Sequence, residues 1–276
     1  MKLFTKTLLA SGLLAAASAQ AANVNINIDN DAVTGASNFA SSLFSVEASE
    51  DFNNLPALGG LTDFDVDDGT DQGSWEARSE NRYIDTRVGK FTSILKGQDS
   101  GNPYNEQLMI ESYDTGEFGR EKLSLDYQDE LADPEADPEL EEPSRPDDFW
   151  LDSNDAQSVR WDFTKPAGGS FNAIGFYMAD AADQGATLSL VLADGGNQFI
   201  DMSKLFPNQG DGNLKFVSIT SDVNIQGGKL FFANSNDRDG FGIDNVTLGK
   251  LPEPGTLLLM GLGLLGLGAA RRRAAK

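Results

Sequence analysis

The side chains of this chain that could carry out chemistry are mostly carboxylates. Its 276 residues include 43 Asp and Glu against 21 Lys and Arg, and neither His nor Cys. This composition excludes histidine-assisted serine catalysis, thiolate nucleophiles and the usual zinc sites. The net charge of −22 opposes nucleic-acid binding. What remains is oxygen chemistry, which means calcium binding or a glycosidase built on two carboxylates.

One acidic run has alternate spacing that is typical of the start of a calcium loop. It contains Asp63, Asp65, Asp67, Asp68 and Asp71 around Gly69. An EF-hand loop requires Gly at the place of Asp68 and Glu where Ser74 stands, so an ordinary acidic loop remains the preferred interpretation.

The carboxylates do not single out a catalytic pair. A glycosidase needs two acids at a set separation, and a chain this rich in acids meets that requirement without any motif. No acid lies in an aromatic-lined motif, and Trp75, Trp150 and Trp161 are as easily core residues as sugar platforms. We therefore predict that the protein is not an enzyme, with a carbohydrate-active enzyme as the alternative.

The elements that must position these acids are strands. Apolar and polar residues alternate at 24–28, 159–163, 174–178 and 188–192, and further runs of branched or aromatic residues lie at 83–88, 108–112, 214–219, 229–233 and 241–248. No long helical pattern competes with them. Short strands separated by Gly-rich turns predict an all-β fold, a jelly-roll-like β-sandwich over residues 22–250.

One segment inside this region cannot build a core. Residues 126–148 contain eleven acids, one base and four prolines. We interpret it as an exposed acidic insertion in a single domain, with a small N-terminal half and a C-terminal half as the alternative.

The N-terminus has the pattern of a secretory signal peptide. Lys2 and Lys6 precede an apolar run at 8–17, and the small residues of Ala19-Gln20-Ala21 suit signal peptidase. Cleavage after residue 21 would leave Ala22 first.

The C-terminus has the pattern of a short membrane helix. Residues 256–270 are uncharged and apolar, and a basic tail, 271–276, follows with Arg271, Arg272 and Arg273. Fifteen residues span about 22 Å of helix, less than the roughly 30 Å of a bilayer core, so the anchor should be weak. The arginines predict a cytoplasmic tail and an exported domain.

Pro252, Glu253 and Pro254 stand directly before this apolar run and its arginines. The order of these three features resembles the PEP-CTERM sorting signal of Gram-negative bacteria, here residues 251–276. That resemblance implies export across the inner membrane, recognition by an exosortase, cleavage near the motif, and delivery to the cell surface or the exopolysaccharide matrix. A plain single-pass anchor is the alternative.

The string from Phe241 to Leu248 resembles the last strand of secreted jelly-roll domains, in which an Asp lies between apolar positions. Such domains often hold a structural calcium between that Asp and carboxylates of the first strands. The resemblance implies a Ca²⁺ site in this chain between Asp244 and either Glu50 or Asp51, with Asp237 or Asp239 as a further ligand. The alternative is that the acids before the last strand form a polar turn.

Together these patterns predict a non-catalytic exported protein. Its expected partners are signal peptidase, exosortase, the inner membrane during a transient anchored stage, and a polysaccharide of the biofilm matrix. Its role would be structural or carbohydrate-binding. A permanently anchored periplasmic binding protein is a further alternative.

Overall fold

A computed structural model describes residues 22–64, 77–79, 82–94, 107–112, 123, 149–153, 156, 158–164, 166–167, 169–179, 184–193, 195–201, 213–234 and 241–252. The expected signal peptide (1–21), the acidic insertion (126–148), Asp237, Asp239 and all residues after Pro252 lie outside this part of the chain. Of the acidic run after Leu61, only Asp63 is described.

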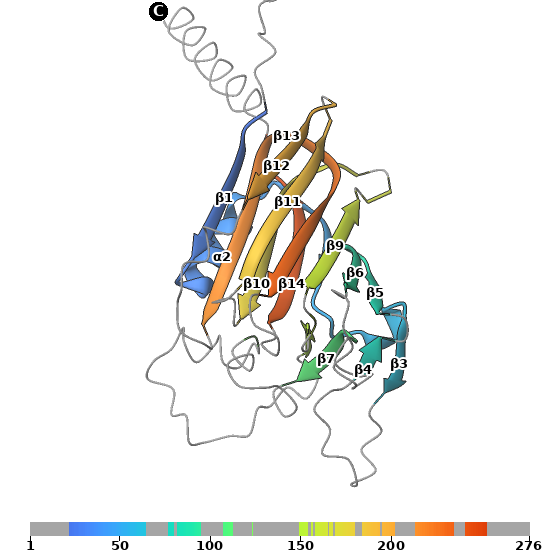
Figure 1. The fold of residues 1–276 in the computed structure, drawn as a ribbon. Coiled ribbons are helices and arrows are strands. Elements are labelled where there is room, and N and C mark those ends of the chain that lie inside the picture. The colour runs from blue at the N-terminus through green and yellow to red at the C-terminus, as the bar shows by residue number, and fades with distance from the viewer. Residues whose placement is uncertain are drawn as a thin grey trace, which may run out of the picture.

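The described residues are mostly strand, and their strands form one curled antiparallel sheet (Figure 1). The strands are β1 (Val24–Asp29), β2 (Ser45–Glu50), β3 (Leu61–Phe64), β4 (Ala77–Ser79), β5 (Tyr83–Thr86), β6 (Gly89–Ser93), β7 (Met109–Ser112), β8 (Phe149–Asp152), β9 (Ser158–Thr164), β10 (Phe171–Ala179), β11 (Gln184–Leu192), β12 (Asn197–Asp201), β13 (Leu214–Asn234) and β14 (Gly242–Lys250). The helices are α2 (Ala32–Ser42) and the short 3₁₀ helix η1 (Leu55–Ala57).

The long strand β13 explains how the sheet curls. Its first part, up to Ile225, pairs with β1 and β10, and its second part pairs with β11 and β9. The two apolar runs that the sequence predicts as separate strands are therefore the two parts of one 21-residue strand. Because the strand changes partners along its length, β9 and β10 face each other, and the rings of Trp161 and Phe176 lie 5.9 Å apart.

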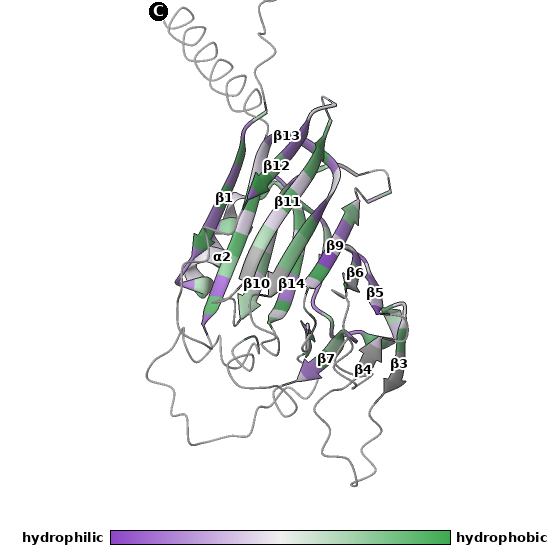
Figure 2. Ribbon diagram, viewed as in Figure 1, coloured by the Kyte–Doolittle hydropathy of each residue, from purple (hydrophilic) through white to green (hydrophobic). Residues whose placement is uncertain are grey.

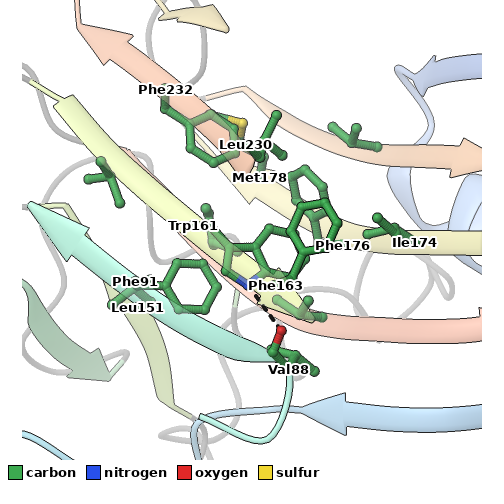
Figure 3. Packing of buried hydrophobic residues seen from close by; sticks show 14 of the residues in the cluster. Val88, Phe91, Leu151, Trp161, Phe163, Ile174, Phe176, Met178, Leu230 and Phe232 are labelled. Carbon is green, nitrogen blue, oxygen red and sulfur yellow. Dashed lines mark hydrogen bonds between the residues drawn. The ribbon is translucent and has the colours of Figure 1, made fainter. Parts of the chain in front are cut away.

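The principal core fills the space enclosed by the curled sheet (Figure 3). Trp161 lies at its centre, stacked on Phe91 at 5.2 Å and tilted against Phe163 at 4.9 Å. Its indole Nε1 donates a hydrogen bond of 3.2 Å to the carbonyl oxygen of Val88, so its one polar atom is satisfied. Hydrophobic and hydrophilic residues alternate along β1 and β9 in Figure 2, and both segments are strands, as their alternation predicts.

A second apolar cluster lies on the opposite face of the sheet, under helix α2. Phe39 of α2 packs on Phe216 at 5.5 Å, and Tyr177 packs on Phe216 at 5.2 Å. A Cβ atom at Gly175 would lie 2.5 Å from the Phe39 ring, so only glycine leaves room for that ring on the sheet. Asp31 caps the helix by accepting a 3.1 Å hydrogen bond from the N–H of Thr34.

The expectation of a β-rich fold is confirmed, and the structure adds an 11-residue helix, α2, that the sequence did not predict. Its sequence is rich in small and polar residues, and its buried side is carried by Ala32, Gly35 and Phe39. Such a face gives a weak helical pattern in the sequence, since glycine and alanine contribute little apolar contrast. The helix is stable here because the sheet covers that side.

Candidate functional site

The last strand of the sheet ends where the predicted sorting signal begins. The backbone N–H of Phe44 donates a 2.6 Å hydrogen bond to the carbonyl oxygen of Lys250, and the N–H of Leu251 donates one of 2.6 Å to Oδ1 of Asn172. Asn172 is buried, and the half-buried Leu251 packs against the cluster under α2. The chain is therefore held to the sheet up to Leu251, and Pro252 is exposed.

Five strands meet at this end of the sheet. The register places residues side by side in the order Asn25, Thr220, Ala173, Gly249 and Val46. The register therefore places the start of β1 and the end of β14 at the same end of the sheet, so the described chain begins and ends there (Figure 1). Strand β14 is paired on both sides here, with β10 and with β2.

The segment between α2 and β2 completes this end. A Cβ atom at Gly249 would lie 2.7 Å from both Cδ atoms of Leu43, so the absence of a side chain lets Leu43 pack against β14. The next apolar side chains point into solvent. Phe44 is 76% exposed and Val46, opposite Gly249, is 58% exposed. We call Phe44 and Val46 the exit pair.

Glu50, one of the predicted calcium ligands, forms an ion pair with Arg87. Glu50 is buried, and its carboxylate accepts hydrogen bonds from the backbone N–H groups of Phe52 and Arg87, each at 3.2 Å. The Arg87 guanidinium lies 3.5 Å from both carboxylate oxygens. This hydrogen bond with Glu50, followed by the attraction of its charge, raises the pKa of Arg87. Glu50 therefore has an ion-pair partner without calcium.

The structure does not bring Glu50 and Asp244 together. Glu50 is opposite Val246, a residue of the principal core, whereas Asp244 is opposite Tyr177, a residue of the cluster under α2. Directly opposed residues of antiparallel strands share a face, so these two acids lie on opposite faces of the sheet. Asp51 is half exposed, with Oδ1 3.7 Å from the Arg87 guanidinium. Within the described residues, no group of three or more Asp and Glu could hold a metal ion.

Sequence reasoning named Asp244 but neither Glu111 nor Asp152, and it did not predict that these acids of three neighbouring strands are buried. Glu111 on β7, Asp152 on β8 and Asp244 on β14 are all buried. Burial, and to a smaller extent the charge of Asp244, raises the pKa of the neighbouring Tyr177 to about 12. Period-two alternation could not reveal that these acids are buried, because it predicts that polar residues between apolar ones face solvent. Here α2 and its cluster cover the face on which Asp244 lies.

Comparison with known proteins identifies the segment that follows the last strand. A family model of the PEP-CTERM protein-sorting motif matches residues 251–273. This chain carries a PEP-CTERM sorting motif. The match begins at Leu251, the last residue held by the sheet, and confirms the resemblance drawn from Pro252, Glu253 and Pro254. It also includes Arg271, Arg272 and Arg273. No curated protein and no solved structure matches the chain.

The PEP-CTERM motif implies an exported protein that an exosortase recognises and that is sorted to the cell envelope or surface. Of the six motif and arginine residues, only Pro252 lies in the described part of the chain. Among the helices described between residues 22 and 252, none is long and apolar enough to cross a membrane.

Proposed function

We propose that this chain is a non-catalytic exported protein, a jelly-roll-like β-sandwich that an exosortase delivers to the surface or exopolysaccharide matrix of a Gram-negative bacterium. Its signal peptide directs export, and residues 256–270 anchor it transiently in the inner membrane. The observation that carries the proposal is the position of the PEP-CTERM motif, which starts at the residue where the folded sheet ends.

The fold is compatible with removal of both ends. Cleavage after residue 21 leaves Ala22, whose carbonyl oxygen accepts a hydrogen bond from Nε2 of Gln198 at 2.6 Å. Cleavage after Pro252 leaves β14 complete, with its pairing to β10 and β2 intact. The processed protein therefore keeps every described strand, and sorting does not require refolding.

The mature surface suits a soluble matrix component. Between residues 22 and 251 the chain has 42 acidic and 15 basic residues. Such a surface keeps the protein soluble and repels anionic polymers unless cations bridge them. A direct polysaccharide contact would use Phe199 on the outer strand pair of β11 and β12, whose ring is 73% exposed.

The decisive experiment follows the C-terminus. The full chain is expressed in a host with an exosortase, and the mass of the secreted protein is measured. We expect loss of the residues that follow the Pro252 motif, and we expect replacement of Pro252, Glu253 and Pro254 by alanine to abolish that loss. An intact C-terminus in the membrane fraction would support the permanently anchored binding protein instead.

Two further tests separate the remaining alternatives. Purified protein from Ala22 to Pro252 should not degrade matrix polysaccharide, whereas turnover that one Asp or Glu replacement abolishes would establish an enzyme. Pull-down with the polysaccharide should weaken in Phe199→Ala if the outer strand pair binds sugar, with Ser49→Ala, an exposed change on β2, as the control.

Calcium remains a proposal for Asp51, Asp237, Asp239 and Asp244, without Glu50. Oxygen ligands of this kind suit Ca²⁺. If the ion binds the native fold, a chelator should lower the melting temperature of the wild type. The same chelator should not change the melting temperature of Asp244→Asn. Equal melting with and without chelator in the wild type would remove calcium from the proposal.

A further inference from the structure

We propose that the exit pair, Phe44 and Val46, lies against the phospholipid surface of the membrane while the C-terminal tail is anchored there. This inference rests on the proposed function, because that function places the apolar residues 256–270 in the bilayer. It adds a membrane contact made by the folded domain to the one that the C-terminal tail makes.

The connection between the sheet and the apolar run is short. Leu251 is fixed by its hydrogen bond to the buried Asn172. From Leu251 to Thr256, where the apolar run begins, the chain has five residue steps, which reach at most about 18 Å when fully extended. The headgroup layer on each side of the hydrocarbon is roughly 5–8 Å thick. The end of the sheet is therefore held within about 13 Å of the headgroups.

The side chains nearest to this connection are those of the exit pair. Phe44 is hydrogen-bonded through its backbone to Lys250, and Val46 is directly opposite Gly249. Both side chains are more than half exposed. Single exposed apolar residues are ordinary on protein surfaces, and Val191 and Phe199 are further examples in this chain. The exit pair differs from them because it adjoins the point where the chain enters the proposed anchor.

The small area of the exit pair suits a lipid surface better than a separate protein. Two side chains bury too little area for a stable complex with a separate protein, which needs more than about 1,000 Å². A tethered surface needs much less, since the tether gives a high effective concentration at the membrane. Aromatic side chains also favour the boundary between headgroups and hydrocarbon.

Charge limits the contact to this end of the sheet. The 42 acidic and 15 basic residues between positions 22 and 251 repel the anionic lipids of a bacterial membrane. The body of the domain should therefore stay off the surface, and only the tethered end should touch it. The same balance predicts that the exit pair cannot hold the protein on the membrane after the tail is cut.

The absence of cysteine from the chain permits a direct test. Single-cysteine variants Phe44→Cys and Val46→Cys carry an environment-sensitive fluorophore in the chain from Ala22 to Lys276, reconstituted into phosphatidylcholine nanodiscs. Ser49→Cys is the matched control, because Ser49 is exposed on the same strand about 10 Å beyond Val46. Leu264→Cys reports whether the tail enters the bilayer.

We expect a blue shift and protection from an aqueous quencher at positions 44, 46 and 264, and neither effect at position 49. A response at 264 without one at 44 and 46 would overturn the lipid contact alone. No response at 264 would overturn the proposed anchoring and the contact with it. Protection at 44 in lipid-free detergent that grows with protein concentration would indicate a second copy as the occupant, and would also overturn the inference.

Discussion

The two apolar clusters of this protein lie on opposite faces of one sheet and are built differently. The principal core is a set of contacting aromatic rings, with Trp161 between Phe91 and Phe163. The cluster under α2 combines two phenylalanines with Tyr177, a glycine gap and the buried carboxylate of Asp244 nearby. The first face is therefore stabilised by buried apolar volume, whereas the second depends on a close fit between a helix and the sheet.

The largest loss of stability should follow Trp161→Ala. The side chain is fully buried, so its removal leaves a large cavity and should lower the free energy of unfolding by roughly 3–5 kcal/mol. Urea unfolding of the mature protein measures this change, and Trp161→Phe should lose less. A loss no greater than that of any change under α2 would contradict the ranking of the two clusters.

Phe39→Ala tests the cluster under α2 and should lower the free energy of unfolding by less, about 3 kcal/mol, because the helix can settle toward the sheet over Gly175. The same urea titration applies, and hydrogen exchange should increase at the amides of α2 before those of β9. Uniform exchange over the whole sheet would show that the helix is not a separately stabilised layer.

Gly175→Ala should destabilise the protein by about 1–3 kcal/mol through overpacking, since the new methyl group collides with the Phe39 ring. The double variant with Phe39→Ala removes the collision and should be less destabilised than the sum of the two single variants by at least about 0.5 kcal/mol. Additive losses would show that the glycine does not serve to seat this ring.

The smallest effect should come from Tyr177→Phe, and it should depend on pH. The pKa of Tyr177, about 12, is above the ordinary tyrosine value of about 10, so the fold favours the neutral phenol. Its contribution is complete below about pH 10 and is lost as the pH rises through about 12. The variant should therefore lose less stability than the wild type between these values in pH-dependent unfolding. Parallel curves would contradict the raised pKa.

Much of the sheet was predictable because its strands are half buried. The alternation around Trp161 and Leu190 identifies β9 and β11 correctly, since one side of each faces the core. The strand around Phe176, β10, was also predicted, although both of its faces are buried. The strands β2, β3, β4, β6, β8 and β12 were missed, because their three to six residues offer too few repeats for a periodic signal. The equally short β5 and β7 were predicted from their branched and aromatic residues instead. The helix α2 was missed because small residues form its buried side.

Of the candidate sites, the sorting motif was also predictable from the sequence, whereas the grouping of the calcium ligands was not. The sorting motif depends only on the order of residues along the chain, so Pro252, Glu253 and Pro254 could be recognised without any structure. The calcium set required knowledge of which acids share a face. The partners of Glu50 and Asp244 across β14 place them on opposite faces, and Arg87 already pairs with Glu50.

The amino-acid sequence by itself determined the acidic surface, the chemistry excluded by the lack of His and Cys, the presence of strands and the sorting motif. These properties follow from composition and from local order. Only the tertiary structure decided that β13 serves both parts of the curled sheet, that Glu50 pairs with Arg87, and that Phe44 lies beside the exit of the chain. Each of these depends on contacts between residues distant in sequence, and no local pattern encodes which distant strands become neighbours.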